Sequence, residues 1–280
     1  MHAKNIPCTL DLSTLREANL NLCDLSNLEK VKWPIEIVYL NKAVFSKQLD
    51  LSGTGTAHLG GCDLSEIEEI KWPRTALSLN GVKLPKMDIL NFSNLSEVDL
   101  SRCDLSKIKE IKWPMNKVRL HLTSFFPPVL DFSLTKEVDL IGSDLSGVEK
   151  IICPSEKLNL SNIFKFSKML NFNQTKEIDF SWSNLSDVEQ ITFAAPIEKV
   201  ILTSATNLPK VLDFSKVQTV DLSWCNFAGV EKVIWPKNVI GLEKARNISN
   251  SVMVSYQKNK EKKSVVTKQQ STVQQKTHIL

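Results

Sequence analysis

The sequence predicts a repeat solenoid: a curved β-solenoid with one parallel concave sheet and a thin convex side of extended or 3₁₀ segments. The motif V-x-L-x-x-C-x-L, clearest at residues 98–105, recurs at steps of 19 to 22 residues. One copy is too short to bury its own apolar face, so the copies must stack on one another. The segments between them are poor in helix signals. The twelve expected strand starts are Ala18, Val38, Ala57, Leu77, Val98, Val118, Val138, Leu158, Ile178, Val200, Val220 and Ile240.

Three parts follow from this frame. We expect residues 1–17 to form an N-terminal cap and first turn, and residues 18–250 an array of about twelve repeats. Residues 251–280 are expected to be a basic, disordered tail, because the chain from Gln257 onward has six lysines, one glutamate and few large apolar residues. The segment from Gln257 onward has a net charge of +5, and the whole chain has a net charge of +4, so the rest of the chain has a net charge of −1. A near-neutral array implies no specific nucleic-acid surface.

The repeats alternate between two types, typified by residues 97–114 and 117–133, so the array consists of six forty-residue double repeats. Between the strands, Ile111-Lys112-Trp113-Pro114 alternates apolar and polar residues, which predicts extended chain. Proline directly after tryptophan disfavours the helical region for the preceding residue. The recurring tryptophans before proline are therefore interpreted as core packing rather than as a ligand cage.

Four of the six cysteines occupy one slot of the repeat. In that slot the side chain is expected to point inward and cap the turn after the strand. No C-x-x-C pair occurs, which argues against a zinc site. We expect buried, reduced thiols here, and also at Cys153, which stands where other repeats have tryptophan. The four are Cys23, Cys62, Cys103 and Cys225.

The frame L-x-L-x-x-[N/C]-x-L resembles leucine-rich repeats. The twenty-residue length and the W-P at Trp113-Pro114 and Trp235-Pro236 look like the short repeats of bacterial effector proteins, which usually have L-P there. This resemblance implies a host-directed role. The chain departs from the pattern in its forty-residue alternation and its scarcity of asparagine at the ladder slot.

Part of the sequence also fits a second fold. Residues 18–22 followed by 23–27 also resemble two pentapeptide repeats, whose tandem copies build a square β-helix. Such a helix needs an unbroken five-residue period, and here the period is expected to stop after two units. A pentapeptide-repeat-like β-helix is therefore the alternative rather than the first choice.

Charges alternate along the stack just before each strand. This column reads Glu97, Lys117, Glu137, Lys157, Glu177 and Lys199. Opposite charges on neighbouring strands, about 4.8 Å apart, support pairing and disfavour a slip by one repeat. We interpret the column mainly as a register device, with a charged partner surface as the alternative.

The column after the strand contains residues with no evident core role. Trp182 and Trp224 stand there two repeats apart, roughly 10 Å at twice the strand spacing. Exposed tryptophan is enriched at interface hot spots. The predicted partner-binding set on the concave face and its edge is Trp182, Trp224, Leu122, Arg119, His121, Asp139, Asp179 and Tyr39.

No catalytic or cofactor motif is recognisable. The patterns G-x-S-x-G, G-x-G-x-x-G, H-E-x-x-H and the Walker motif do not occur. His58 and His121 are about three repeats apart, or roughly 15 Å, too far to share a metal. No apolar run reaches signal-peptide or membrane-spanning length.

These observations predict a non-enzymatic protein-interaction scaffold, a monomer that binds a protein partner on its concave surface. No cofactor, metal, small-molecule substrate or membrane span is expected. The protein is expected to be cytoplasmic, or secreted into a host cell without a classical signal peptide. An effector acting on host proteins and an intracellular adaptor of the producing cell both remain open.

Overall fold

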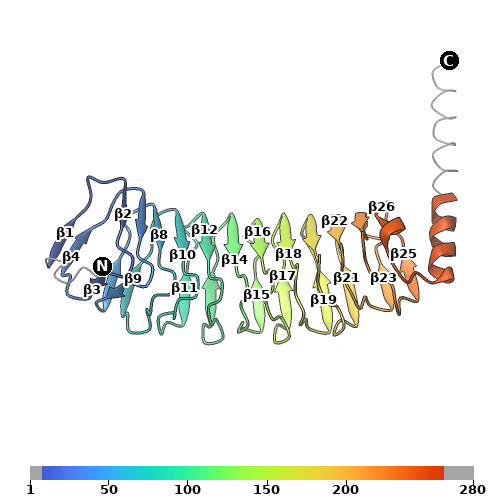
Figure 1. The fold of residues 1–280 in the computed structure, drawn as a ribbon, viewed down its shortest axis with the longest axis horizontal. Helices are drawn as coiled ribbons and strands as arrows, with labels where there is room; N and C mark the ends of the chain where they lie inside the picture. The colour runs from blue at the N-terminus through green and yellow to red at the C-terminus, as the bar shows by residue number, and fades with distance from the viewer. Residues whose placement is uncertain (1–7, 262–280) are drawn as a thin grey trace, which may run out of the picture.

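A single parallel sheet of twelve short strands runs the length of the molecule. The computed structural model describes residues 8–261, and Figure 1 shows them as an elongated, gently curved stack with this sheet along one side. We call it the long sheet. Its strands are β2 (Glu17–Asn19), β5 (Ile37–Tyr39), β8 (Thr56–His58), β10 (Ala76–Ser78), β12 (Glu97–Asp99), β14 (Lys117–Arg119), β16 (Glu137–Asp139), β18 (Lys157–Asn159), β20 (Glu177–Asp179), β22 (Ile197–Ile201), β24 (Val217–Asp221) and β26 (Asn238–Ile240).

The register of the long sheet confirms the predicted repeat solenoid. Val98, Val118 and Val138 are aligned on neighbouring strands, as the motif requires. The prediction was wrong by one residue in the last strand, where Val239, not Ile240, is aligned with Val220. The reason is burial: a slip of one residue would turn the strand over, and Val239 is half-buried whereas Ile240 is 46% exposed.

On the opposite, convex side the strands pair only two by two. Each pair joins one repeat to the next and has no hydrogen-bonded strand beyond it among the described residues, so these pairs recur about every forty residues. The pairs are β1 (Thr9–Asp11) with β4 (Lys30–Lys32), β7 (Gln48–Asp50) with β9 (Glu69–Lys71), β11 (Ile89–Asn91) with β13 (Glu110–Lys112), β15 (Val129–Asp131) with β17 (Lys150–Ile152), β19 (Met169–Phe172) with β21 (Gln190–Phe193), and β23 (Val211–Asp213) with β25 (Lys232–Ile234).

Aromatic rings pack across the seams between these pairs, where backbone hydrogen bonds are missing. The ring centroids of Trp113 and Phe132 lie 5.2 Å apart, and those of Trp72 and Phe92 lie 5.5 Å apart. Trp113 is 7% exposed. The prediction that these tryptophans belong to the core is therefore confirmed.

A third side links the repeats in the other phase. Short bridges there join the first-type repeat to the second-type repeat that follows it, whereas the convex pairs join the second type to the next first type. Each repeat is thus linked to one neighbour on the convex side and to its other neighbour on the third side. The bridges are β3 (Asp24–Leu25) with β6 (Val44–Phe45), Asp63 with Lys83, Asp104 with Phe125, Asp144 with Lys165, Asn184 with Thr206, and Asn226 with Arg246.

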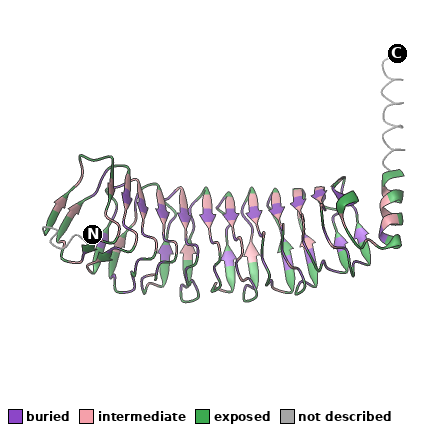
Figure 2. Ribbon diagram, viewed as in Figure 1, coloured by how far each residue is buried: buried purple, intermediate pink, exposed green. Residues whose placement is uncertain are grey.

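The core lies between the three sides, and the ribbon in Figure 2 shows buried residues in strands along the whole stack. In the first-type repeat, inward residues recur every five positions through a whole turn. Val98, Cys103, Ile108, Trp113 and Val118 are all buried. The expectation that a five-residue period stops after two units is therefore wrong for these repeats. A pentapeptide-like β-helix fits the fold as well as a leucine-rich repeat does.

The cysteine slot is buried as predicted at Cys62, Cys103 and Cys225, whereas Cys23, near the N-terminal end of the stack, is only half-buried. The Cys103 thiol is 3% exposed and donates a hydrogen bond to the Leu79 carbonyl at 3.0 Å. Burial raises the pKa of this thiol to about 12, which keeps it protonated. Where the slot holds serine, the hydroxyl makes the same bond. The further donors are Cys62 to Leu40, Cys225 to Leu202, Ser143 to Leu120 and Ser183 to Leu160.

The C-terminal end of the stack is closed by a helix over residues 250–261. Val252 is 1% exposed, and the Tyr256 ring lies 4.9 Å from that of Trp235. The prediction of disorder from residue 251 is thus wrong for residues 251–261, because Val252, Met253 and Tyr256 form an apolar face that covers the last repeat. Residues 262–280 of the predicted tail lie outside the described residues. Among residues 8–261, no helix has the length and apolarity to cross a membrane.

Candidate partner-binding groove at the edge of the long sheet

The turn after each strand of the long sheet places one residue in left-handed backbone. Across eleven consecutive repeats this residue has φ between 54° and 68°. A side chain in this region clashes with the following carbonyl, so glycine is favoured there. Only three of the eleven are glycine. The column is Leu22, Lys42, Gly61, Gly81, Arg102, Leu122, Gly142, Asn162, Trp182, Ser204 and Trp224.

Trp182 and Trp224 stand out in this column. Both have φ of 63°, and their side chains are 66% and 52% exposed. Two repeats separate them, which is about 10 Å at twice the strand spacing. Because the backbone is the same at both positions, the two side chains leave it in the same direction. The pair therefore places two exposed indoles, which we call the posts, at the same edge of the sheet.

Between these posts lies a groove of about 710 Å³. Ser204, from the intervening repeat, forms its floor, so a small side chain occupies the column position between two large ones. The remaining lining is polar and contains no carboxylate. The Trp182–Trp224 groove is lined by Trp182, Thr203, Ser204, Thr206, Trp224, Asn226, Arg246 and Asn247.

Two contacts order the C-terminal wall of the groove. The guanidinium carbon of Arg246 lies 6.0 Å from the centre of the Trp224 ring, within cation–π range. The Asn247 amide donates a hydrogen bond of 2.8 Å to Asn226 Oδ1. Arg246 and Asn226 also form a backbone bridge between their repeats. Arg246 is thus held beside Trp224 by the same link that joins the last two repeats.

The groove has to be interpreted from its own chemistry. No family model, curated protein or solved structure matches this chain. Within residues 8–261, no group of three or more His, Cys, Asp or Glu side chains is placed to hold a metal ion. What the groove offers is two aromatic faces, hydroxyl and amide groups, and one cation.

Of the eight predicted site residues, the structure brings Trp182 and Trp224 together at this groove, and it brings Arg119, His121 and Asp139 together in a separate place on neighbouring strands of the long sheet. Leu122 is 48% exposed in the same column, but it lies three repeats from Trp182, roughly 15 Å along the stack. An added Cβ at Gly142 would meet its Cδ2 at 2.8 Å, so Leu122 packs over that glycine. Tyr39 stacks on His58, with ring centroids 4.9 Å apart, near the other end of the molecule.

The remaining predicted residues are engaged with the long sheet itself. Arg119 Nη1 lies 2.7 Å from Glu97 Oε2, and His121 Nε2 lies 2.9 Å from Asp139 Oδ2. Asp179 accepts a hydrogen bond of 2.8 Å from the Ser181 backbone N–H, which closes the turn after its strand. Asp139 does the same for Ile141 at 3.3 Å.

The alternating charge column forms ion pairs only in part. Lys117 Nζ lies 3.1 Å from Glu137 Oε2, and Lys157 Nζ lies 2.7 Å from Glu177 Oε1. The hydrogen bond to Glu177 raises the pKa of Lys157. Glu97 pairs instead with Arg119 in the neighbouring column. These contacts fit the interpretation of the column as a register device.

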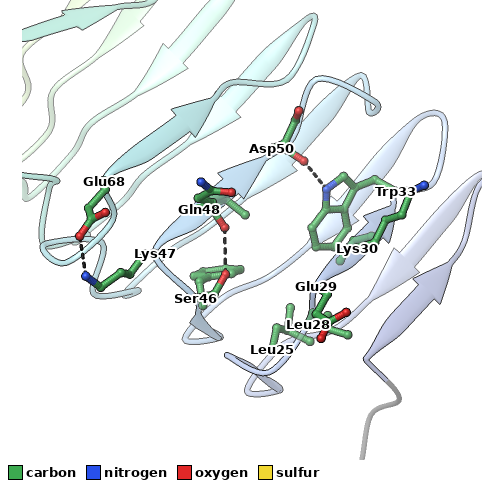
Figure 3. A pocket seen from close by; sticks show the side chains of 13 residues that line it. Leu25, Leu28, Glu29, Lys30, Trp33, Ser46, Lys47, Gln48, Asp50 and Glu68 are labelled. Carbon is green, nitrogen blue, oxygen red and sulfur yellow. Dashed lines mark hydrogen bonds and ion pairs between the residues drawn. The ribbon is translucent and has the colours of Figure 1, made fainter.

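Other hollows follow from the seams of the architecture. Figure 3 shows a convex-side example, between β4 and β7, where Trp33 Nε1 donates to the Asp50 carbonyl at 2.5 Å and Lys47 pairs with Glu68 at 2.6 Å. A second lies between β17 and β19. A third, on the bridge side, separates Lys83 from Asp104. Each sits where a lateral ladder is interrupted, as the Trp182–Trp224 groove also does, but none of the three is lined by an exposed tryptophan.

Sequence reasoning missed the polar lining of the groove. Thr206, Asn226 and Arg246 occupy bridge positions, which the strand motif does not reach. A signal was available, because Asn226 stands in the slot that most first-type repeats fill with aspartate, such as Asp63 and Asp104. This change removes a carboxylate from the groove.

Proposed function

We propose that this protein is a non-enzymatic interaction scaffold that binds a partner protein at the Trp182–Trp224 groove. One observation carries the proposal: two tryptophans are held in left-handed backbone and exposed to solvent. Backbone strain of this kind costs of order 1–3 kcal/mol and persists where the surrounding structure over-determines it, as the repeated turn does throughout this column. Neither side chain gains a buried place in the core in return.

Tryptophan is well suited to such a role. It offers a large rigid surface at low cost in side-chain entropy, and it is enriched among residues that dominate binding energy. The groove is too small for a whole stable interface, which typically buries about 800 Å² on each partner. We therefore assign it the role of an anchor, with the neighbouring half-exposed face of the long sheet as the rim.

The motif frame supports a leucine-rich-repeat array, and the five-residue burial period supports a pentapeptide-like β-helix equally. An effector exported into a host cell and an adaptor retained in the producing cell would use the groove in the same way. A reporter fusion separates these two roles. Delivery into a second cell that depends on a secretion system supports the effector, and retention supports the adaptor.

Affinity capture with quantitative mass spectrometry tests the proposal. The baits are the wild-type chain, a Trp182→Ala/Trp224→Ala double variant, and a control variant with Met115→Ala and Leu134→Ala. The control removes apolar side chains that are 64% and 81% exposed outside the groove.

A partner recovered by the wild type and the control should be lost with the double variant, and should then bind the purified chain directly. Thermal unfolding verifies that all three baits are folded. Equal recovery of the same partners by the wild type and the double variant would show that the groove is not the contact.

A further inference from the structure

We propose that the Trp182–Trp224 groove recognises a polyproline II segment with prolines at positions i and i+3, flanked by acidic residues. The inference rests on the proposed function and names the class of partner. It draws on three features of the groove: the spacing of its two aromatic posts, the donors between them, and the sign of its charge.

The spacing of the posts matches the polyproline II helix. Trp182 and Trp224 are separated by two strand spacings, about 9.6 Å. A polyproline II helix has three residues per turn and rises 3.1 Å per residue, so positions i and i+3 lie on one face about 9.3 Å apart. One proline ring can therefore contact each indole, and the turn between them lies over Ser204.

Other backbones fit less well. Same-face residues of an extended strand are about 6.6–6.8 Å apart at i and i+2, which falls short of the posts. An α-helix places positions i and i+7 about 10.5 Å apart, but its carbonyls are already paired within the helix. The donors that line the groove would then have no backbone acceptors to meet.

The donors suit a backbone without internal hydrogen bonds. Every carbonyl of a polyproline II segment is free to accept, and aromatic-lined grooves bind such segments at low ordering cost. Thr203 and Thr206 bring hydroxyl groups into the groove. Asn226 uses Oδ1 to accept from Asn247, which leaves its amide nitrogen as a donor.

The positive charge of the groove favours negatively charged residues beside the prolines of the bound segment. Arg246 is the one ionised side chain among the eight lining residues. It lies over Trp224, so an acidic residue beside the second proline would meet it. A segment with aspartate or glutamate at the intervening or flanking positions should therefore bind more tightly than one with lysine.

The test is a titration of synthetic peptides, followed by the emission of the six tryptophans, among which the exposed Trp182 and Trp224 report on the groove. The probes are acetylated, amidated nonapeptides with three Pro-x-x units, where x is alanine with glutamate, alanine alone, or alanine with lysine. Each has a partner of the same composition whose prolines are spaced i and i+4. The proteins are the wild type, Trp182→Ala, Trp224→Ala, Ser204→Leu, and Leu134→Ala as a control.

The Pro-x-x series should shift the emission of the wild type and of Leu134→Ala to shorter wavelength. Loss of either tryptophan should weaken binding about tenfold or more, as for a hot-spot residue. Ser204→Leu should also weaken it by filling the floor while both indoles remain. Glutamate peptides should bind more tightly than lysine peptides, and the difference should shrink in high salt.

Two results would overturn the proposal: i and i+3 peptides that bind no better than their i and i+4 partners, or a hexasaccharide of glucose or N-acetylglucosamine that shifts the emission when no peptide does. The proposed function has a separate outcome. Protein partners lost only with the double variant, together with peptides that fail to bind, would refute the polyproline assignment and keep the scaffold.

Discussion

The long sheet and the two lateral sides solve the same stacking problem in different ways. The sheet is hydrogen-bonded without a break across twelve strands, whereas the convex side is divided into six separate pairs. The bridges on the third side join the repeats in the opposite phase. The sheet therefore has a twenty-residue unit, and the lateral sides have a forty-residue one.

This difference indicates which part of the fold sets which property. The sheet fixes the direction and register of the stack, because every strand has a partner on it. The lateral sides decide which repeat can follow which, because each pair needs one repeat of each type. We infer that the cooperative unit of folding is the double repeat, as nearest-neighbour coupling in solenoids suggests.

Deletion of repeats should have the largest effect on stability, and it tests whether the lateral sides determine the order of the repeats. Removal of residues 117–156 takes out one double repeat and leaves Lys157 to follow Asn116 in the place of Lys117. Removal of residues 117–136 instead sets Glu137 beside Glu97 and leaves β17 without β15. Each lost backbone hydrogen bond is worth about 0.5–1.5 kcal/mol. We expect the shorter deletion to have a Tm roughly 10 °C below that of the longer one, or not to fold.

Differential scanning calorimetry on both deletion variants measures this difference. The longer deletion also serves as the control for shortening the stack, because it removes more chain. Equal Tm values for the two variants would show that the lateral pairing carries no preference for repeat order.

A charge reversal on the long sheet and one on a lateral side should have effects of intermediate size on Tm, and they compare the two sides directly. Lys157→Glu on the long sheet creates a run of three carboxylates with Glu137 and Glu177. It should cost about 1 kcal/mol, or about 2–4 °C in Tm, and less in 1 M salt. The matched control is Lys168→Glu, whose partner Glu189 lies 2.9 Å away on a lateral side with both side chains well exposed. A fall in Tm for Lys168→Glu as large as that for Lys157→Glu would contradict the register role of the column.

The sequence motif predicted the features that recur in every turn, but it did not predict contacts between residues at different positions of neighbouring repeats. The strand register and the cysteine slot follow from one motif. Cys103 occupies the cysteine position of its copy, and Leu79, whose carbonyl accepts its hydrogen bond, occupies the leucine position of the copy before it. The groove depends on Arg246, which reaches Trp224 from the next repeat through a bridge that the motif does not describe. The helix over residues 250–261 forms only because the last repeat presents a surface such as Trp235 for it to cover.

Replacement of a post by glycine separates stability from binding. Trp182 is 66% exposed and has φ of 63°, so Trp182→Gly loses little burial and relieves the backbone strain. We expect a Tm within about 2 °C of wild type, equivalent to less than about 1 kcal/mol. The control is Leu160→Ala, a fully buried residue of the same stack, which should cost about 2–5 kcal/mol. A large loss of stability in Trp182→Gly would mean that this indole packs against the fold.

The smallest expected effect is a pH dependence on the long sheet itself. Burial lowers the pKa of His58, which stacks on Tyr39, while the charge of Asp99 acts in the opposite direction. Because the folded pKa lies below the unfolded value of about 6.5, the fold favours the neutral ring. That stability is complete above the unfolded pKa and is lost as the pH falls toward and through the folded one. Thermal unfolding at pH 7.5 and pH 5.0 should therefore show a smaller drop in Tm for His58→Gln than for wild type, and identical drops would rule out a neutral, stacked His58.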